Sequence, residues 1–472
     1  MKHAVFCVLL VAVACGPSVN HNGGNDADPG ACSPGATEDC YSGQDGTDGV
    51  GPCHAGTRTC TDQKVWSQCE GEVVPAAENC GDGADNNCNG TADEDVDADG
   101  DGFTTCGGDC CDSTECGSPK LVNPGAFDAP GNSVDDDCNG VTDDAQLLCD
   151  QGLTSSTANA VDFAKAIDIC QTATVGDKKW GVISAKLTLA DGTGVPADRS
   201  HAIRPKFGTN VVPQGGMAMA LLSTGAAAGK DDTNPNWQDF ESGAGLFGNA
   251  TQSSFPQDYV TANGNKLPNA PGCPNPNGDK ALDPVMLTLE VRVPTNAKSF
   301  KLNANFFSSE FPEYTCSPFN DFFVVLLDSV YAGTPANPTD KNLAFYTPPG
   351  GTAKFPVGVN LASGDTGLFT QCVNGATGCR GSAGTISTCL ATDELIGTGL
   401  ESVTPFSCDA NSLQGGGTGW LETSGNVQGG EIIKLRIAIW DTSDHALDSI
   451  AAIDGFQWSI DASQPGTVIF RK

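Results

Sequence analysis

The feature that most constrains this chain is its cysteine content. Of 22 cysteines in 472 residues, Cys7 lies in an apolar N-terminal stretch and Cys15 directly follows that stretch. The remainder divides into 14 cysteines from Cys32 to Cys170 and six from Cys273 to Cys408. Even groups, in a chain without a Cys-x-x-Cys pair and with five scattered histidines, predict disulfides formed in an oxidising compartment rather than zinc sites.

The adjacent Cys110 and Cys111 cannot easily bond each other, so each is expected to have another partner. Cys149 and Cys170 are expected to form one bridge. The disulfide candidates in the acidic and connecting segments are Cys80, Cys88, Cys106, Cys110, Cys111, Cys116, Cys138, Cys149 and Cys170.

The N-terminus predicts export. Residues 4–14 are apolar but too short to cross a bilayer, which is typical of a signal peptide, here residues 1–14. Ala12 to Cys15 resemble a bacterial lipobox, so Cys15 is the expected lipidation site and residues 16–30 a flexible tether. The expected location is therefore the outer membrane or cell surface, with the lipid as the sole membrane contact; a soluble secreted protein is the alternative.

Composition separates the segments that follow. The 58 acidic and 24 basic residues give a net charge of −34, which excludes a nucleic-acid partner and suits cation binding. Four segments are expected: a disulfide-stapled module at 31–77 with Trp66 as its apolar anchor, an acidic region at 78–144, a helical connector at 145–175 and a large β domain at 176–472.

The acidic region contains an internal repeat. Residues 85–94 match residues 135–144 with Asp, Cys, Asn and Gly in register, and Asp-Ala-Asp-Gly-Asp-Gly stands between them at 97–102. Oxygen ligands at alternate positions before a glycine indicate calcium and resemble the first half of an EF-hand loop. Position twelve of such a loop would be Gly108, so further ligands must come from elsewhere. The predicted ligands are Asp85, Asp93, Asp95, Asp97, Asp99, Asp101, Asp109, Asp112, Asp135, Asp137 and Asp143.

The alternative is a solvated acidic run without a bound ion. Interleaved cysteines and glycines in register favour the metal site, because a solvated run requires neither. Carboxylates packed within a few Å repel each other by about 1 kcal/mol per pair even in water. A structural calcium is therefore the expected cofactor.

The strings at 78–90, 97–102, 108–110, 124–126 and 135–140 resemble the MopE-type metal-binding repeat of bacterial surface proteins. The resemblance covers about 65 residues. It implies cation binding at the cell surface. The family's association with copper is not carried over, because residues 78–144 contain no His or Met.

The C-terminal region reads as mainly β. Residues 287–293, 300–306 and 433–439 alternate between apolar and polar, which predicts half-buried antiparallel strands. The apolar run 322–327 predicts a central strand, and 468–470 a closing one. With Gly- and Pro-rich connections, these strands predict a β-sandwich of jelly-roll type. One amphipathic helix is expected at about 158–169, with Val161, Phe163, Ala164 and Ile167 inward.

A second resemblance lies in this region. The strings at 308–314, 319–323, 440–449 and 453–456, with 221–226, are similar to the choice-of-anchor L domain of exported bacterial proteins. The resemblance spans most of residues 200–461 and implies a surface or secreted location.

The same strings predict a second cation site, because side-chain oxygens that converge at strand ends often hold calcium in sandwich domains. The alternative is that these residues cap turns. The candidates are Glu310, Asn320, Asp321, Asp441, Asp444 and Asp448.

The sequence shows no nucleophile elbow, zinc-protease motif, phosphate-binding loop or dinucleotide fingerprint, so no enzyme is predicted. The leading hypothesis is a surface lipoprotein with calcium-stabilised acidic repeats, whose sandwich binds an extracellular glycan, a matrix component or a cell-surface ligand in adhesion. The alternatives are a metal-sequestering surface protein and an extracellular glycan hydrolase with Glu310 and Glu313 as its carboxylates.

Overall fold

The computed structural model describes residues 32–76, 78–93, 95, 97–112, 117–145, 147–240, 250–364, 366–378, 385–386, 388–401 and 415–470. The predicted signal peptide, Cys15 and Cys116 lie outside these residues. The chain forms two compact units, Met1–Asp95 and Val96–Lys472, so the division falls inside the acidic region. In the described part of the chain, every helix is too short or too polar to traverse a lipid bilayer.

The first unit is held together by disulfides. Its strands β1 (Thr37–Cys40) and β2 (Gly56–Thr59) pair antiparallel. The bridges are Cys32–Cys60, Cys40–Cys69 and Cys53–Cys88. The buried apolar side chains described here are half-cystines, while Trp66 is half-buried with the Arg58 guanidinium 5.1 Å from its ring. These bridges confirm the predicted disulfide stapling of the N-terminal region, and Cys53–Cys88 links the segment predicted as a module at 31–77 to the acidic region.

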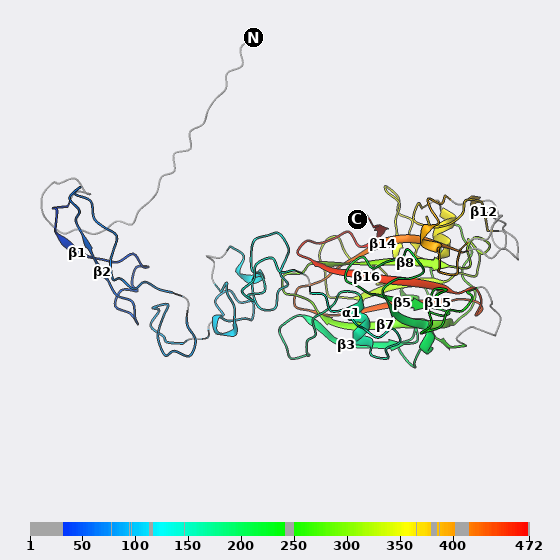
Figure 1. The fold of residues 1–472 in the computed structure, drawn as a ribbon, viewed down its shortest axis with the longest axis horizontal. Helices are drawn as coiled ribbons and strands as arrows, with labels where there is room; N and C mark the ends of the chain where they lie inside the picture. The colour runs from blue at the N-terminus through cyan, green and yellow to red at the C-terminus, as the bar shows by residue number, and fades with distance from the viewer. Residues whose placement is uncertain are drawn as a thin grey trace, which may run out of the picture. The chain divides into compact units, whose positions relative to one another are not determined.

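The second unit is built on two antiparallel sheets (Figure 1). The six-stranded sheet has the order β17 (Gly466–Ile469), β14 (Gly416–Asn426), β8 (Ser299–Ser308), β16 (Ser449–Ser459), β5 (Met219–Ser223) and β4 (His201–Arg204). The five-stranded sheet has the order β3 (Gly181–Thr188), β7 (Ala281–Arg292), β15 (Ile432–Asp441) and β9 (Phe322–Asp328), with β6 (Gln252–Ser253) beside β7.

The remaining elements are short. They are α2 (Gln257–Ala262), the strand pairs β10 (Phe345–Tyr346) with β11 (Phe355–Pro356) and β12 (Ala376–Thr377) with β13 (Thr385–Ile386), and the 3-10 turns η1 (Thr105–Gly107), η3 (Pro119–Leu121), η4 (Asp198–Ser200), η5 (Val359–Gly364) and η6 (Asp393–Leu395).

One apolar core lies between the two sheets. It contains Leu289 of β7, Phe306 of β8, Ile437 of β15 and Ile453 of β16, all fully buried. The alternation read from the sequence is visible in β7, where Thr288 and Glu290 are half-buried between buried neighbours. The chain is therefore mainly β, as predicted, and the pair of sheets is compatible with a jelly roll.

Two strand predictions differ from the structure. The prediction of one polar face on β8 is wrong, because Asn303 and Asn305 are also buried: a second apolar cluster around Phe307 covers the outer face, and Asn305 donates to Glu394 at 2.8 Å. β9 ends its sheet rather than lying centrally. Its run is apolar because Val325 faces the central core and Val324 faces a third cluster on the opposite face.

The predicted helix is α1 (Ala160–Ala166). The Asn159 side chain accepts a hydrogen bond from the Val161 backbone N–H, which is an ordinary helix N-cap. Phe163, Ala164 and Ile167 are buried, as expected, and Val161 is half-buried. The helix is shorter than predicted because Asp168 adopts a left-handed backbone conformation with φ 74°. The predicted Cys149–Cys170 bridge is present.

Candidate metal centres

Three loops of the acidic region share one hydrogen-bond pattern. We call residues 85–90, 97–102 and 135–140 the first, second and third acidic loops. In each, the first aspartate accepts hydrogen bonds from the backbone N–H groups four and five residues later, at 2.8–3.1 Å. The pairs are Asn89 and Gly90 to Asp85, Asp101 and Gly102 to Asp97, and Asn139 and Gly140 to Asp135.

The backbone of the loops repeats as well. The fourth residue has a positive φ in each, at Cys88 (59°), Gly100 (78°) and Cys138 (58°), and so does the sixth, a glycine with φ between 92° and 99°. A left-handed conformation at the sixth position favours glycine, which explains its presence in all three sequences. The short Asp-x-Asp/Asn spacing therefore encodes one local structure three times.

An aspartate three residues after the first loop, and another three residues after the third, binds the backbone just before the same loop. Asp93 accepts hydrogen bonds from the N–H groups of Gly81 (2.7 Å) and Gly83 (2.9 Å). Fifty residues later, Asp143 accepts from Gly131 (2.7 Å) in the same way. Asp93 and Asp143 were predicted as ligands, and the structure places their carboxylates on backbone N–H groups, outside the carboxylate groups described next.

The second loop is where carboxylates gather. Oxygens of Asp97, Asp99 and Asp101 lie within 4.8 Å of one another, and so do oxygens of Asp99, Asp109 and Asp112. Asp112 also holds the loop, since it accepts from the Ala98 N–H at 2.6 Å. The predicted ligands Asp109 and Asp112 are thus brought to Asp99.

Two oxygens in this group have no hydrogen-bond partner although they are buried, Oδ2 of Asp99 and Oδ2 of Asp109. Asp109 is 5% exposed. Burial, and then repulsion by Asp101 and Asp112, raises the pKa of Asp109 to about 6, while its hydrogen bond from the Cys111 N–H opposes that shift. Burial also raises the pKa of Asp101. These carboxylates are held close together at an electrostatic cost that a bound cation would remove.

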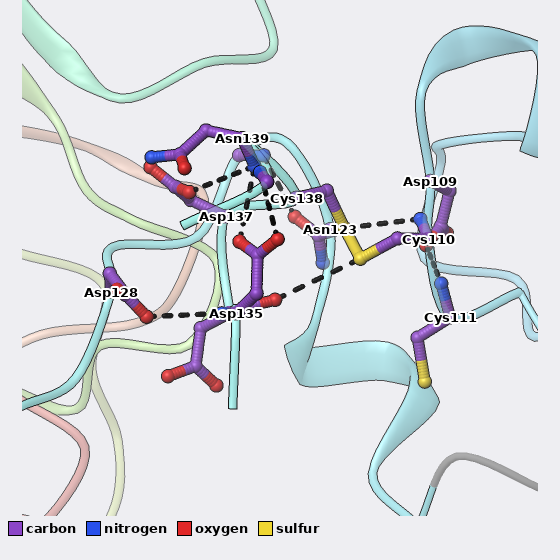
Figure 2. Close-up of a disulfide and its surroundings, with 12 residues drawn as sticks. Asp109, Cys110, Cys111, Asn123, Asp128, Asp135, Asp137, Cys138 and Asn139 are labelled. Carbon is purple, nitrogen blue, oxygen red and sulfur yellow. Dashed lines mark hydrogen bonds between the residues drawn. A yellow bond between two sulfur atoms is a disulfide. The ribbon is translucent and has the colours of Figure 1, made fainter. Parts of the chain in front are cut away.

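A disulfide joins the segment that follows the second loop to the third loop. Figure 2 shows the Cys110–Cys138 bridge, with Asp109 on one side and Asp135, Asp137 and Asn139 on the other. Cys110 is next to Asp109, so the bridge fixes that ligand candidate relative to the third loop. Cys80, Cys106 and Cys111 are also disulfide-bonded.

Sequence reasoning missed Asn123. Its Nδ2 donates to Asp101 Oδ2 at 2.7 Å, and its Oδ1 accepts from Thr295 Oγ1 at 2.8 Å, so it connects the second loop to the residues that follow β7. An isolated asparagine outside the repeat carries no sequence signal for this role.

The other predicted ligands are not grouped in this way. In the described residues of the first and third loops, no three acidic, His or Cys ligand atoms come within 4.8 Å of one another around Asp85, Asp135 or Asp137. Asn87, Asn89 and Asn139 occupy positions where the second loop has aspartates. Asp95 is the last residue of the first unit and belongs to none of the groups.

The third loop also lines a cavity of about 450 Å³. Trp180, Phe456 and Trp458 form aromatic walls, and Asp137 and Asp144 contribute carboxylates. The two tryptophan rings meet edge to face at 6.3 Å, and Trp458 Nε1 is buried without a hydrogen-bond partner. Aromatic faces beside a few polar groups are typical of small-ligand sites.

The sandwich holds a further carboxylate group. Glu310 follows β8, Asp321 precedes β9 and Asp441 ends β15. Their oxygens lie within 4.8 Å of one another, and the residues are 2%, 0% and 2% exposed. The structure thus brings together three of the six residues predicted for this site.

The other three lie around this group. Burial, and then the charge of Asp321, raises the pKa of Asp448, but the Asp448 carboxylate packs against Gly225, where an added Cβ would lie 2.0 Å from Asp448 Oδ2. Asp444 accepts from the Ala446 N–H, as a turn-capping residue does. Asn320 is buried, and its Oδ1 has no hydrogen-bond partner.

Burial dominates the electrostatics here. It raises the pKa of Asp321 to about 7 and holds the pKa values of Glu310 and Asp441 well above their usual range, helped by mutual repulsion. Asp283, which the sequence analysis missed, also lies near this group and accepts from or donates to His445 Nδ1 at 2.7 Å, depending on protonation. Burial raises the pKa of Asp283 and of Asp448, and the positive charge of Arg199 opposes both shifts.

The donor sets and the fold define a class: a mainly β, disulfide-linked chain with oxygen-rich loops whose carboxylates are suited to a metal ion. Comparison with protein families matches the family described as "Putative metal-binding motif", of the MopE type, at residues 75–94 and 119–144. These ranges contain the first and third acidic loops and leave out the second. Comparisons with curated proteins and with solved structures found no match. The chain therefore carries a metal-binding motif, in agreement with the resemblance read from the sequence.

Proposed function

We propose that this chain is a non-catalytic, exported bacterial surface protein whose acidic region binds calcium. The observation that carries the proposal is the convergence of Asp99, Asp109 and Asp112, with two buried carboxylate oxygens that lack hydrogen-bond partners. The matched motif supports metal binding on either side of this group.

The donors favour calcium over other cations. Calcium takes six to eight oxygen ligands at about 2.3–2.6 Å in flexible geometry, whereas magnesium keeps its waters and copper prefers nitrogen or sulfur. The second loop supplies carboxylate ligands. Asp109 and Asp112 contribute the ligands that an EF-hand would take from the second half of its loop. Residues 78–144 contain no His or Met.

Calorimetric titration of the purified full chain tests this proposal. We expect calcium to bind with a dissociation constant of about 10⁻⁴ to 10⁻³ M, as in other extracellular modules. Asp99→Asn combined with Asp109→Asn should weaken the binding at least tenfold at this site. Asp461→Asn, which removes one exposed charge in the same unit, is the control and should bind as the wild type does. Equal binding by all three proteins would contradict the proposal.

The surface location rests on the sequence. We propose that Cys15 is lipidated and that residues 200–461 form a choice-of-anchor L-like domain held at the cell surface by that lipid. Disulfides in both units support an oxidising compartment. Mass spectrometry of the mature N-terminus tests the anchor: a diacylated Cys15 is expected, and an unmodified N-terminus would favour the secreted alternative.

We further propose that the sandwich binds an extracellular glycan, matrix component or cell-surface ligand in adhesion. The aromatic cavity supports a glycan, because a sugar ring offers an apolar face to Trp180 and Trp458 and hydroxyls to Asp137 and Asp144. A glycan array should show binding that Trp458→Ala abolishes and Trp66→Ala, a change in the first unit, leaves unchanged. Binding lost in neither variant would contradict this use of the cavity.

Two alternatives have distinct tests. Metal sequestration predicts copper binding that outcompetes calcium in the titration. A glycan hydrolase predicts activity on a polysaccharide panel that Glu310→Gln removes. The burial of Glu310 and Glu313, 2% and 6% exposed, favours the non-catalytic proposal, because a sugar could not reach them without rearrangement.

A further inference from the structure

The sandwich carboxylates are placed by strand register. Antiparallel β9 and β15 pair with Phe322 opposite Trp440, so the next positions outward are Asp321 and Asp441. Like charges directly opposite on neighbouring strands destabilise a sheet. Glu310 joins them from the other sheet, two residues beyond the end of β8. The group therefore lies where strand ends from both sheets meet.

Nothing positive in the described chain neutralises this group. Ion pairs in the described residues involve neither Glu310, Asp321 nor Asp441. His445 and Arg199 act on Asp283 and Asp448 instead. One backbone N–H, that of Asp321, reaches Glu310 at 3.3 Å.

The hydrogen bonding of the Asp321 carboxylate also indicates a bound cation, independently of the strand register. It is completely buried, and neither of its carboxylate oxygens has a hydrogen-bond partner with good geometry, although Asp441 and Ser449 lie beside it. A turn-capping aspartate would accept backbone N–H groups, as Asp97 and Asp143 do. A buried ionised carboxylate costs several kcal/mol or more, and the nearest donors in the chain are the Ser449 hydroxyl and a protonated Asp441, so a cation is the partner that would let the clustered carboxylates ionise together.

We propose that Glu310, Asp321 and Asp441 bind a divalent cation of the calcium class between the ends of the two sheets. Oxygens around a calcium ion at about 2.3–2.6 Å from it lie no more than roughly 5 Å apart, which fits the 4.8 Å limit found here. Three carboxylates supply three to six of the ligands, and backbone oxygens or waters complete the shell. The site is separate from the acidic loops and does not depend on the function proposed for them.

The cation would connect the loop after β8 and the loop after β15, each of which is already held by a disulfide or a hydrogen bond. The loop after β8 is tied by the Cys273–Cys316 disulfide. The loop after β15 is tied to the residue before Asp321, because Thr442 Oγ1 donates to the Asn320 carbonyl at 2.9 Å. A bound ion would connect both loops to β9 and so stabilise one end of the sandwich.

The test uses the full chain with Asp321→Asn and Asp441→Asn combined, which removes two charges and keeps the side-chain shape. In a chelator, this variant should melt at the same temperature as the wild type or higher, because two buried charges are gone. In calcium at a hundred times the dissociation constant, the wild type should gain about 5 °C and the variant should not. Native mass spectrometry should count one calcium fewer in the variant.

Controls separate this site from the acidic loops. The Asp99→Asn, Asp109→Asn protein should keep the calcium-dependent shift of the sandwich transition, and Asp461→Asn should behave as the wild type. An equal calcium shift in the wild type and the Asp321→Asn, Asp441→Asn variant would overturn the proposal, as would no shift in either. The first outcome would place any stabilising calcium elsewhere, and the second would leave a cluster of protonated carboxyls.

A second measurement does not depend on the folding of that variant. Trp440 precedes Asp441 and stacks on Phe322 with ring centroids 5.8 Å apart, so terbium bound at the site should show tryptophan-sensitised emission. Trp440→Phe should reduce that emission several-fold while calcium still displaces terbium. Emission that is absent, or unchanged in Trp440→Phe, would contradict the proposal.

Discussion

The acidic loops and the sandwich carboxylates differ in how many backbone N–H groups donate hydrogen bonds to their clustered carboxylates. In the loops, each leading aspartate accepts several nearby backbone N–H groups, as Asp97 does from Gly100, Asp101 and Gly102. In the sandwich, Asp321 is buried by β-strands whose N–H groups are engaged in the sheets. Local hydrogen bonds thus make the first arrangement a property of a few residues, whereas the second depends on the entire fold.

The interactions that hold the surrounding backbone in place also differ between the first unit and the sandwich. Residues of the first unit are held by disulfides and turns, and those of the sandwich by an apolar core. The difference indicates that the loops are modules that fold with little tertiary context. The sandwich site exists only when both sheets are formed.

Reduction should give the largest effect and tests this contrast directly. Removing a native disulfide from a small domain costs about 2–5 kcal/mol, and the first unit has at least three with few other buried side chains. Under dithiothreitol, hydrogen exchange at residues 32–93 should approach that of an unfolded chain, while β7, β8 and β15 stay protected. Retained protection of the first unit would show that the disulfides do not hold it.

A pH series should give the next largest effect. Burial, followed by the charge of Asp150, raises the pKa of Asp168 to about 6, and burial raises that of Asp454 to about 7. Both exceed the unfolded value near 4, so their protonated forms favour the folded state. Their stabilisation is complete below pH ~4 and is lost as the pH rises through 6 and 7.

Urea unfolding in metal-free buffer measures this effect. From pH 5 to pH 7.5, the free energy of unfolding should fall by roughly 1.4 kcal/mol from Asp168 alone, since the rise from pH 5 to its pKa of about 6 spans one pKa unit, which corresponds to about 1.4 kcal/mol. Asp168→Asn should flatten that part of the profile. Asp177→Asn, at an exposed position, should leave the profile as it is. A wild-type profile that rises over this range would contradict the assignment.

Removing the Asp93 carboxylate, which binds the backbone before the first acidic loop, should have a smaller effect on stability. Asp93→Ala removes the acceptor for the N–H groups of Gly81 and Gly83, and lost caps of this kind cost about 1 kcal/mol. We expect faster hydrogen exchange at these two amides, with exchange in the sandwich unchanged. Asp62→Ala, an exposed change in the same unit, is the control. Unchanged exchange at Gly81 and Gly83 would mean that the loop does not need its closing carboxylate.

The smallest effect is expected from a solvent-exposed ion pair. Glu38 and Arg58 form a salt bridge across β1 and β2, with side chains 41% and 39% exposed. Glu38→Gln should change stability by less than about 0.5 kcal/mol, because such pairs are screened by water and salt. A larger loss in a melting experiment would show that this small sheet depends on charge pairing rather than on its disulfides.

The sequence allowed prediction of features with local causes. The acidic loops follow from Asp-x-Asp/Asn spacing and a glycine, and β7 and β15 follow from alternating residues. It could not show that Asn303 and Asn305 would be covered by a second apolar cluster, because that burial comes from loop residues such as Leu395 and Leu400. Nor could it show which aspartates cap N–H groups and which converge, since Asp93 and Asp109 read alike in sequence.

The sequence also could not show which residues far apart in the chain come into contact. Glu310, Asp321 and Asp441 were all singled out, but their convergence depends on the pairing of β9 with β15 and on the stacking of two sheets. Asp283 and Asn123 gave no signal, because each acts through a residue far away in the chain. The disulfide partners of most cysteines were unknowable from spacing for the same reason.

The complete burial of Asp321 has a kinetic consequence. An ion surrounded by ligands without solvent contact can enter or leave only when the ends of the strands separate, so its exchange should be as slow as that opening. Loading with terbium and its displacement by calcium should therefore proceed at the rate of that opening rather than at the rate of diffusion. A brief change in the composition of the medium would leave the bound ion in place, and a lasting one would exchange it.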